Sequence, residues 1–155
     1  MKRLIVCTGP ISSGTRLLTR VVTALCPDDE VKHRSMPHWD RFWSVGEEFP
    51  GRQPVFLIIT RRADYSIKSA YREGHGNPEV AGWEHYQRRL TKRDLEEWWW
   101  KAMGYLSLLP NSFWLSYEAM VTGYTAQTKN IAHWLGVEWR WENLPDIYDG
   151  NEKWR

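Results

Sequence analysis

The residues best suited to chemistry begin near the N-terminus. There an apolar segment, residues 4–7, runs into a loop of small residues and then into an amphipathic segment. Gly9 and Gly14 in this loop permit backbone conformations that a side chain would obstruct. Ser13 or Thr15 can place a hydroxyl near the first helical turn, whose N–H groups lack intrahelical partners. Because exposed N–H groups and the helix macrodipole both favour negative charge, the pattern predicts an anion site.

The spacing of the two glycines is that of a Walker A phosphate loop. The Lys-Ser/Thr pair that should follow Gly14 is replaced here by Thr15-Arg16. This difference argues against an ordinary ATP or GTP hydrolase and favours a related phosphate-binding loop with other chemistry. A tight strand-to-helix turn that binds no ligand is the simpler alternative.

A second group of polar residues follows the apolar segment 55–60. Arg61 comes directly after this segment, and Ser69 lies eight residues further on, in an expected helix. Arg61 could pair with two phosphate oxygens in fork geometry while Ser69 donates one hydrogen bond. The alternative is that Arg61 or Arg62 pairs with a surface carboxylate and Ser69 is solvated. Together with the anion loop, two phosphate sites are the better interpretation.

The elements that must position these residues alternate between strands and helices. Apolar runs predict strands at 4–7, 55–60 and 113–116, with a weaker one at 30–34. Three- and four-residue spacing and capping residues predict helices at 15–25, 64–73, 91–109 and 125–135. This order predicts an α/β fold of three layers, α/β/α, with a mainly parallel sheet and a P-loop-like strand-loop-helix at the N-terminus. Such sheets bind ligands beyond the carboxyl ends of their strands.

Composition narrows the class of protein further. At 155 residues we expect one domain over 1–155, and a formal charge of +2 is too small for general nucleic-acid binding. We find no secretory leader and no apolar stretch of membrane-spanning length, and Cys7 and Cys26 are expected to be reduced packing residues. We therefore expect a cytoplasmic protein that binds neither nucleic acid nor membrane. The eleven Trp could fill a core or line an aromatic acceptor pocket.

Several of these motifs resemble those of the sulfotransferases that use 3′-phosphoadenosine 5′-phosphosulfate (PAPS). The segment 11–16 resembles their 5′-phosphosulfate loop, although Ser12 stands where the family has a basic residue. Arg61 and Ser69 reproduce the spacing of the family's 3′-phosphate motif. The pair 117–118 (Tyr-Glu) and the segment 134–136 (Trp-Leu-Gly) resemble later family features.

The resemblance implies transfer of a sulfonyl group from PAPS to a hydroxyl or amine, leaving 3′,5′-bisphosphoadenosine (PAP), with no metal. The acceptor would be a small molecule or a glycan, and a homodimer is left open. The cofactor-binding residues implied are Ser12, Ser13, Gly14, Thr15, Arg16, Arg61, Ser69, Lys153 and Arg155. Arg16 would stabilise charge on the leaving phosphate and is the candidate substitute for the missing cation at Ser12.

An acceptor hydroxyl also needs a general base, and a neutral imidazole suits this role near pH 7. His33 and His38 both lie in the interval where the family places its catalytic His. His33 is preferred because it follows the expected strand, His75 is a weaker third candidate, and a His without a role is the alternative for each.

Two other functions remain open. One is a nucleotide or small-molecule kinase with a P-loop, which the absence of the loop Lys disfavours. The other is a catalytically inactive nucleotide-binding module, which Ser12 at the position of the expected cation favours.

Overall fold

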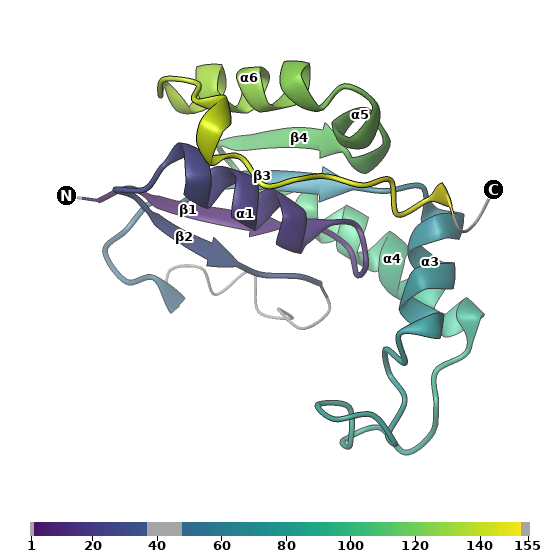
Figure 1. The fold of residues 1–155 in the computed structure, drawn as a ribbon. Coiled ribbons are helices and arrows are strands. Elements are labelled where there is room, and N and C mark those ends of the chain that lie inside the picture. The colour runs from purple at the N-terminus through teal and green to yellow at the C-terminus, as the bar shows by residue number, and fades with distance from the viewer. Residues whose placement is uncertain (1, 37–47, 153–155) are drawn as a thin grey trace.

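The computed structural model describes residues 2–36 and 48–152, which form a parallel four-stranded sheet between helices (Figure 1). The strand order is β2-β1-β3-β4, and all three strand pairs are parallel. The strands are β1 (Leu4–Thr8), β2 (Glu30–His33), β3 (Val55–Thr60) and β4 (Ser112–Ser116). The helices are α1 (Thr15–Leu25), α3 (Ala63–Arg72), α4 (Lys92–Leu106), α5 (Tyr117–Thr122) and α6 (Tyr124–Leu135), and a 3-10 turn, η2, spans Trp141–Asn143.

The two central strands are the ones with continuous apolar sequence. Every residue of β1 is buried, as are the four middle residues of β3, which explains why neither strand alternates between apolar and polar residues. Successive residues of β1 serve opposite faces of the sheet. Ile5 and Cys7 belong to the core on one face, and Leu4 and Val6 to the core on the other.

Helices cover both faces, so the predicted three-layer α/β/α fold is confirmed. On one face, Leu18 and Val22 of α1 and Ile131 of α6 belong to the same core cluster as Ile5 and Cys7 of β1. On the other face, Ala102 and Leu106 of α4 belong to the second core cluster. Figure 1 shows α1 in front of the sheet and α4 behind it, with α6 above β4 in this view.

Most local expectations from sequence are confirmed, with small shifts at element ends. Thr91 caps α4 with a capping box, in which its side chain accepts from the Asp94 N–H and its own N–H donates to the Asp94 carboxylate. Gly136 ends α6 in the left-handed conformation. Helix α4 ends at Leu106 rather than near residue 109.

One helix was missed, because residues 117–122 were given no element between the expected strand 113–116 and the expected helix 125–135. Helix α5 starts directly after β4, where the Ser116 side chain accepts a hydrogen bond from the Ala119 N–H and caps it. With only six residues, this segment is too short to show the repeat of apolar residues by which a helix is recognised in the sequence.

The remaining sequence expectations concern cysteines, tryptophans and membrane spans. Cys7 and Cys26 are free and buried, as predicted, and burial raises the pKa of the Cys7 thiol to about 12. Trp99 is buried whereas Trp100 is 60% exposed, as expected for successive residues on one helix. Among the described helices, none has the length and apolar character needed to cross a bilayer.

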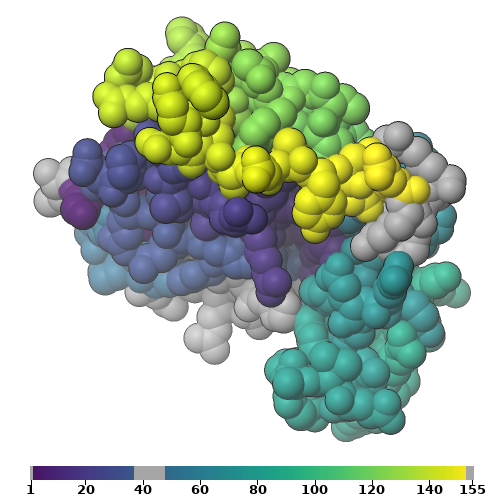
Figure 2. All heavy atoms as spheres, viewed as in Figure 1, coloured from purple at the N-terminus to yellow at the C-terminus, as the bar shows by residue number. Residues whose placement is uncertain are grey.

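Residues 73–91, between α3 and α4, form an excursion that projects from the body of the molecule. Figure 2 shows it as a teal lobe, with the surface hollowed between it and the rest of the molecule. The Leu90 N–H donates to the Gly76 carbonyl and closes its base. Trp83 is buried and stacks near His75, with 5.3 Å between the ring centroids. The lobe is therefore organised around an aromatic cluster that fixes His75.

Candidate functional site

The candidate site lies at the carboxyl edge of the sheet, where β1, β3 and β4 end side by side. Thr8 pairs with Ile58, and Thr60 pairs with Ser116, so the loops that follow these strands meet. The sequence analysis expected ligand-binding residues at this edge, because the carboxyl ends of parallel strands converge there.

The loop after β1 leads into α1 without a side-chain cap. Gly14 is the residue before the helix and has a φ of 96°, in the left-handed region that glycine adopts without strain. The Ser13 hydroxyl donates to the Pro10 carbonyl at 2.6 Å and is fully buried, so it braces the loop instead of capping the helix. The first N–H groups of α1 are thus left for another acceptor.

Thr15, at the start of α1, contacts the first of the two predicted histidines. Its Oγ1 lies 2.9 Å from Nε2 of His33, which ends β2. Burial, reinforced by the positive charges of Arg16 and Arg34, holds the pKa of His33 below its usual 6.5. At neutral pH the imidazole is therefore uncharged and can accept a proton. His38 lies outside the described residues.

Arg61 is a buried cation held by neutral groups. It is 7% exposed, and its guanidinium donates to the Ser12 carbonyl at 3.1 Å, the Gly150 carbonyl at 3.2 Å and Oδ1 of Asn151 at 2.7 Å. Its guanidinium carbon also lies 4.9 Å from the ring centroid of Tyr117. Within the part of the chain that is described, no carboxylate pairs with it, so its charge is available to an anion.

The C-terminal segment, residues 146–152, reaches this edge and joins the contacts of Arg61. The Gly150 N–H donates to the Tyr117 hydroxyl at 2.9 Å, and the Asn151 side-chain amide donates to Glu118 at 3.1 Å. Figure 1 shows the segment, in yellow, running in front of the sheet towards the carboxyl ends of the strands. The predicted residues Lys153 and Arg155 follow it and lie outside the described residues.

Ser69 and Ser12, which the sequence analysis assigned to two different phosphates, share one partner. That partner is Glu73, whose two carboxylate oxygens accept from Ser69 Oγ at 2.9 Å and from Ser12 Oγ at 3.1 Å. The second oxygen also lies 3.2 Å from Nε2 of His75. These contacts, that of His75 first, lower the pKa of Glu73 to about 2 against the opposing effect of burial.

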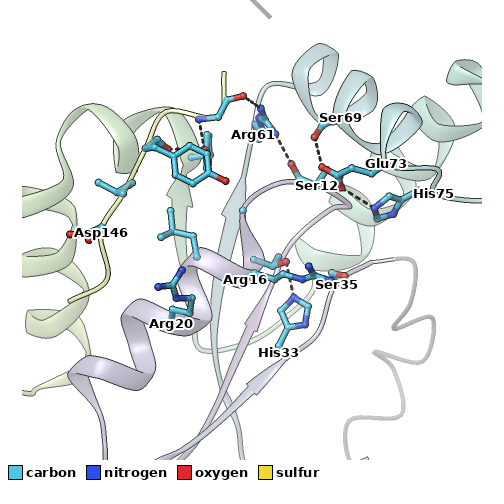
Figure 3. Close-up of a pocket in the computed structure, with 17 residues that line it drawn as sticks. Ser12, Arg16, Arg20, His33, Ser35, Arg61, Ser69, Glu73, His75 and Asp146 are labelled. Atoms are coloured by element: carbon cyan, nitrogen blue, oxygen red, sulfur yellow. Dashed lines mark hydrogen bonds and ion pairs between the residues drawn. The ribbon is translucent and has the colours of Figure 1, made fainter. Parts of the chain in front are cut away.

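Most of these groups line one pocket of about 430 Å³ (Figure 3). In Figure 3, Arg16, His33 and Ser35 lie on one side of the pocket, Ser69, Glu73 and His75 on another, and Arg61 beside the C-terminal segment. The predicted residues that line the pocket are Ser12, Gly14, Thr15, Arg16, His33, Arg61, Ser69 and His75. Ser13 is buried behind the loop, and Arg16 is exposed at the pocket.

Sequence reasoning missed several lining residues, of which Glu73 matters most. A Glu four residues after Ser69 on one helix could have been noticed, because residues at this spacing are neighbours. The pocket is also lined by Arg20, Asp146, Tyr148 and Gly150. No sequence pattern around the last three predicts that they line a pocket. Residues 2–36 and 48–152 contain no cluster of three potential metal ligands.

The arrangement of strands and helices is that of a sulfotransferase. The solved structure of mouse sulfotransferase SULT7A1 complexed with PAP matches 92% of this chain with a TM-score of 0.63 and 13% sequence identity. The chain spans about 61% of the length of that protein. No family model matches the chain. No curated protein matches it either. The chain therefore has a sulfotransferase-like fold.

Proposed function

We propose that this protein binds a nucleotide phosphorylated at the 3′ and 5′ positions and transfers a sulfonyl group from PAPS to a hydroxyl or amine. The observation that carries the proposal is the buried guanidinium of Arg61, whose acceptors among the described residues are neutral and which lies beside the uncapped start of α1. Two positive sites at one sheet edge suit a ligand with two anionic groups. The fold and the PAP in the mouse structure agree with this choice of ligand.

In this proposal, different residues of the pocket bind the two anionic groups of the nucleotide. The N–H groups at the start of α1, the Thr15 hydroxyl and Arg16 would hold the 5′ group, and Arg61 with Ser69 the 3′-phosphate. The donor supplies the sulfonyl group. By analogy with phosphoryl transfer, the contribution of the protein would be positioning and charge stabilisation, for which fixed N–H groups and guanidinium groups suffice.

His33 is the candidate general base among the described residues. It is neutral at pH 7, lines the pocket and contacts Thr15, which binds the 5′ group in this proposal. Its neutral imidazole would accept the proton that an acceptor hydroxyl or amine loses. The acceptor class proposed remains a small molecule or a glycan, and the proposed location is the cytoplasm.

A second candidate function is nucleotide binding without turnover. It is favoured by Ser12, whose hydroxyl donates to Glu73 and which brings no positive charge to the position of the family's basic residue. Arg16 lies exposed at the pocket and is the residue that would supply the charge.

A thermal-shift series tests the proposal. PAP, ATP with Mg²⁺ and GTP with Mg²⁺ are each added at saturating concentration. A ligand at one hundred times its Kd adds about 2.7 kcal/mol of apparent stability, which is roughly 5 to 10 °C for a chain of this size. We expect this rise with PAP alone. A larger rise with ATP and Mg²⁺ would overturn the sulfotransferase proposal in favour of the kinase alternative.

A turnover assay distinguishes the sulfotransferase from the inactive nucleotide-binding module. The protein is incubated with PAPS labelled in the sulfonyl group and with a panel of hydroxyl and amine acceptors. Transfer of label to any acceptor supports the sulfotransferase. Binding of PAP with no transfer across the panel, in wild type and with Ser12→Lys, supports the inactive module.

A further inference from the structure

Glu73 occupies an unusual position between the two predicted phosphate contacts. It directly follows α3, and its N–H donates to the carbonyl of Ser69, one helical turn back. This places its side chain on the same face as Ser69 and beside the loop after β1, which carries Ser12. One carboxylate thus joins two segments that are 61 positions apart in the chain.

The bonds of Glu73 are the bonds that a phosphate would make. Both serine hydroxyls act as donors to carboxylate oxygens, in the way that hydroxyls bind phosphate oxygens. Each hydroxyl has one proton to donate, so Ser12 and Ser69 cannot serve Glu73 and a phosphate at the same time. The carboxylate and the ligand must compete for them.

The charge of Glu73 adds to this competition. The contacts that lower its pKa to about 2 keep it ionised at neutral pH. Its side chain is 51% exposed, and its donors among the described residues are two hydroxyls and an imidazole, with no Lys or Arg ion pair. A carboxylate held by such groups is easier to displace than one paired with a guanidinium. Left in place, it would repel an incoming phosphate.

We propose that Glu73 is an internal competitor for the anion subsite of Ser12 and Ser69, which the second phosphate of the nucleotide must displace in order to bind. His75, fixed by its packing near Trp83, holds the carboxylate in the occupied position. Removing the charge of Glu73 therefore strengthens binding of a nucleotide with a 3′-phosphate and leaves one with a 3′-hydroxyl largely unaffected. This inference rests on the proposed function, because it takes the 3′-phosphate as the ligand of Ser69. It assigns the Ser12 hydroxyl to the same phosphate, and not to the 5′ group expected from sequence, because Glu73 accepts from both hydroxyls.

Calorimetric titration of the full chain tests it, with PAP and adenosine 5′-monophosphate as the two probes. In Glu73→Gln we expect the affinity for PAP to rise by roughly tenfold and that for the monophosphate to change by less than about twofold. Glu79→Gln, in the same lobe but away from the pocket, changes the net charge equally and should alter neither affinity. Glu73→Ala serves as a second variant and should show the same selective gain.

The two proposals fail in different ways. If wild type prefers PAP to the monophosphate but neither Glu73 variant binds PAP more tightly, the competitor role is overturned and the proposed function stands. If wild type does not prefer PAP, the proposed function is overturned and the competitor role with it.

Discussion

The guanidinium of Arg61 donates to the backbone carbonyl of Ser12 at 3.1 Å, a contact between residues 49 positions apart. It ties the loop after β1 to the end of β3. The neighbouring loop carbonyl, that of Ile11, accepts a hydrogen bond from the buried hydroxyl of Ser66 in α3. The two predicted phosphate motifs are therefore parts of one hydrogen-bonded structure.

The first prediction concerns the ligand selectivity of Arg61. Arg61→Ala should lower the affinity for PAP by about 10- to 100-fold, because a hydrogen bond to a charged group contributes about 1.5 to 3 kcal/mol. The affinity for adenosine 5′-monophosphate should fall far less. Titration of both nucleotides measures the difference.

The control for this change is the neighbouring arginine. Arg62 is exposed and pairs with Asp64, so Arg62→Ala should leave both affinities within about twofold of wild type. Equal losses for the two nucleotides in Arg61→Ala would mean that Arg61 does not contact the 3′-phosphate.

The second prediction concerns the loop conformation at Gly14. Gly14→Ala should lower the free energy of unfolding by about 2 kcal/mol or more, because a side chain is strained at this positive φ. The new Cβ would also lie 2.6 Å from Cδ2 of Tyr117. Denaturant unfolding followed by circular dichroism measures the loss.

Gly104 offers a matched control with the opposite sign. It lies within α4, and a Cβ built there meets no atom within 4 Å. Gly104→Ala should stabilise the protein by about 0.5 to 1 kcal/mol through the higher helix propensity of alanine. A similar change in both variants would argue against a strained loop at Gly14.

The third prediction concerns the pKa of His33. NMR titration should place it below 6.5, and Arg16→Gln should raise it by removing a nearby positive charge. It should still remain below 6.5, since burial is the larger cause. Arg93→Gln, on the exposed face of α4, should leave it unchanged.

The same shift has a consequence for stability. Below pH 6.5 the unfolded chain binds a proton at His33 that the folded protein does not, so the unfolded state gains stability. The contribution of His33 to the free energy of unfolding should therefore fall as the pH drops from 6.5 through the folded pKa. His33→Gln should flatten this part of the pH profile, and an unchanged profile would contradict the lowered pKa.

The fourth prediction concerns the hydroxyl that holds the C-terminal segment. Tyr117→Phe removes the acceptor of the Gly150 N–H and should destabilise the protein by about 1 kcal/mol. It should also speed hydrogen exchange at the Gly150 amide. Tyr148 is 83% exposed, so Tyr148→Phe should change neither quantity. Exchange at Gly150 that is equal in both variants would rule out Tyr117 as the anchor.

The sequence was sufficient for the four strands and most of the helices, and it predicted that the residues of two candidate binding motifs lie at one edge of the sheet. Continuous apolar runs in β1 and β3 and the apolar spacing of α1 are local signals, and a strand that ends in a glycine loop before a helix is recognisable without its neighbours. Arg61 and Ser69 could be linked because their spacing lies within one strand-helix unit. In each case the physical cause acts over a few residues.

Only the tertiary structure decided which partners these residues have. Ser12 contacts Glu73 across 61 positions, and Arg61 contacts Asn151 across 90, distances at which no periodicity or capping rule applies. Even the loop after β1 depends on remote groups, because Ser66 of α3 donates to its Ile11 carbonyl and Glu73 accepts from its Ser12 hydroxyl. The sequence by itself determined the strand-loop-helix units and predicted hydroxyls that could bind an anion, and the packing of distant segments placed a carboxylate of the protein on two of those hydroxyls.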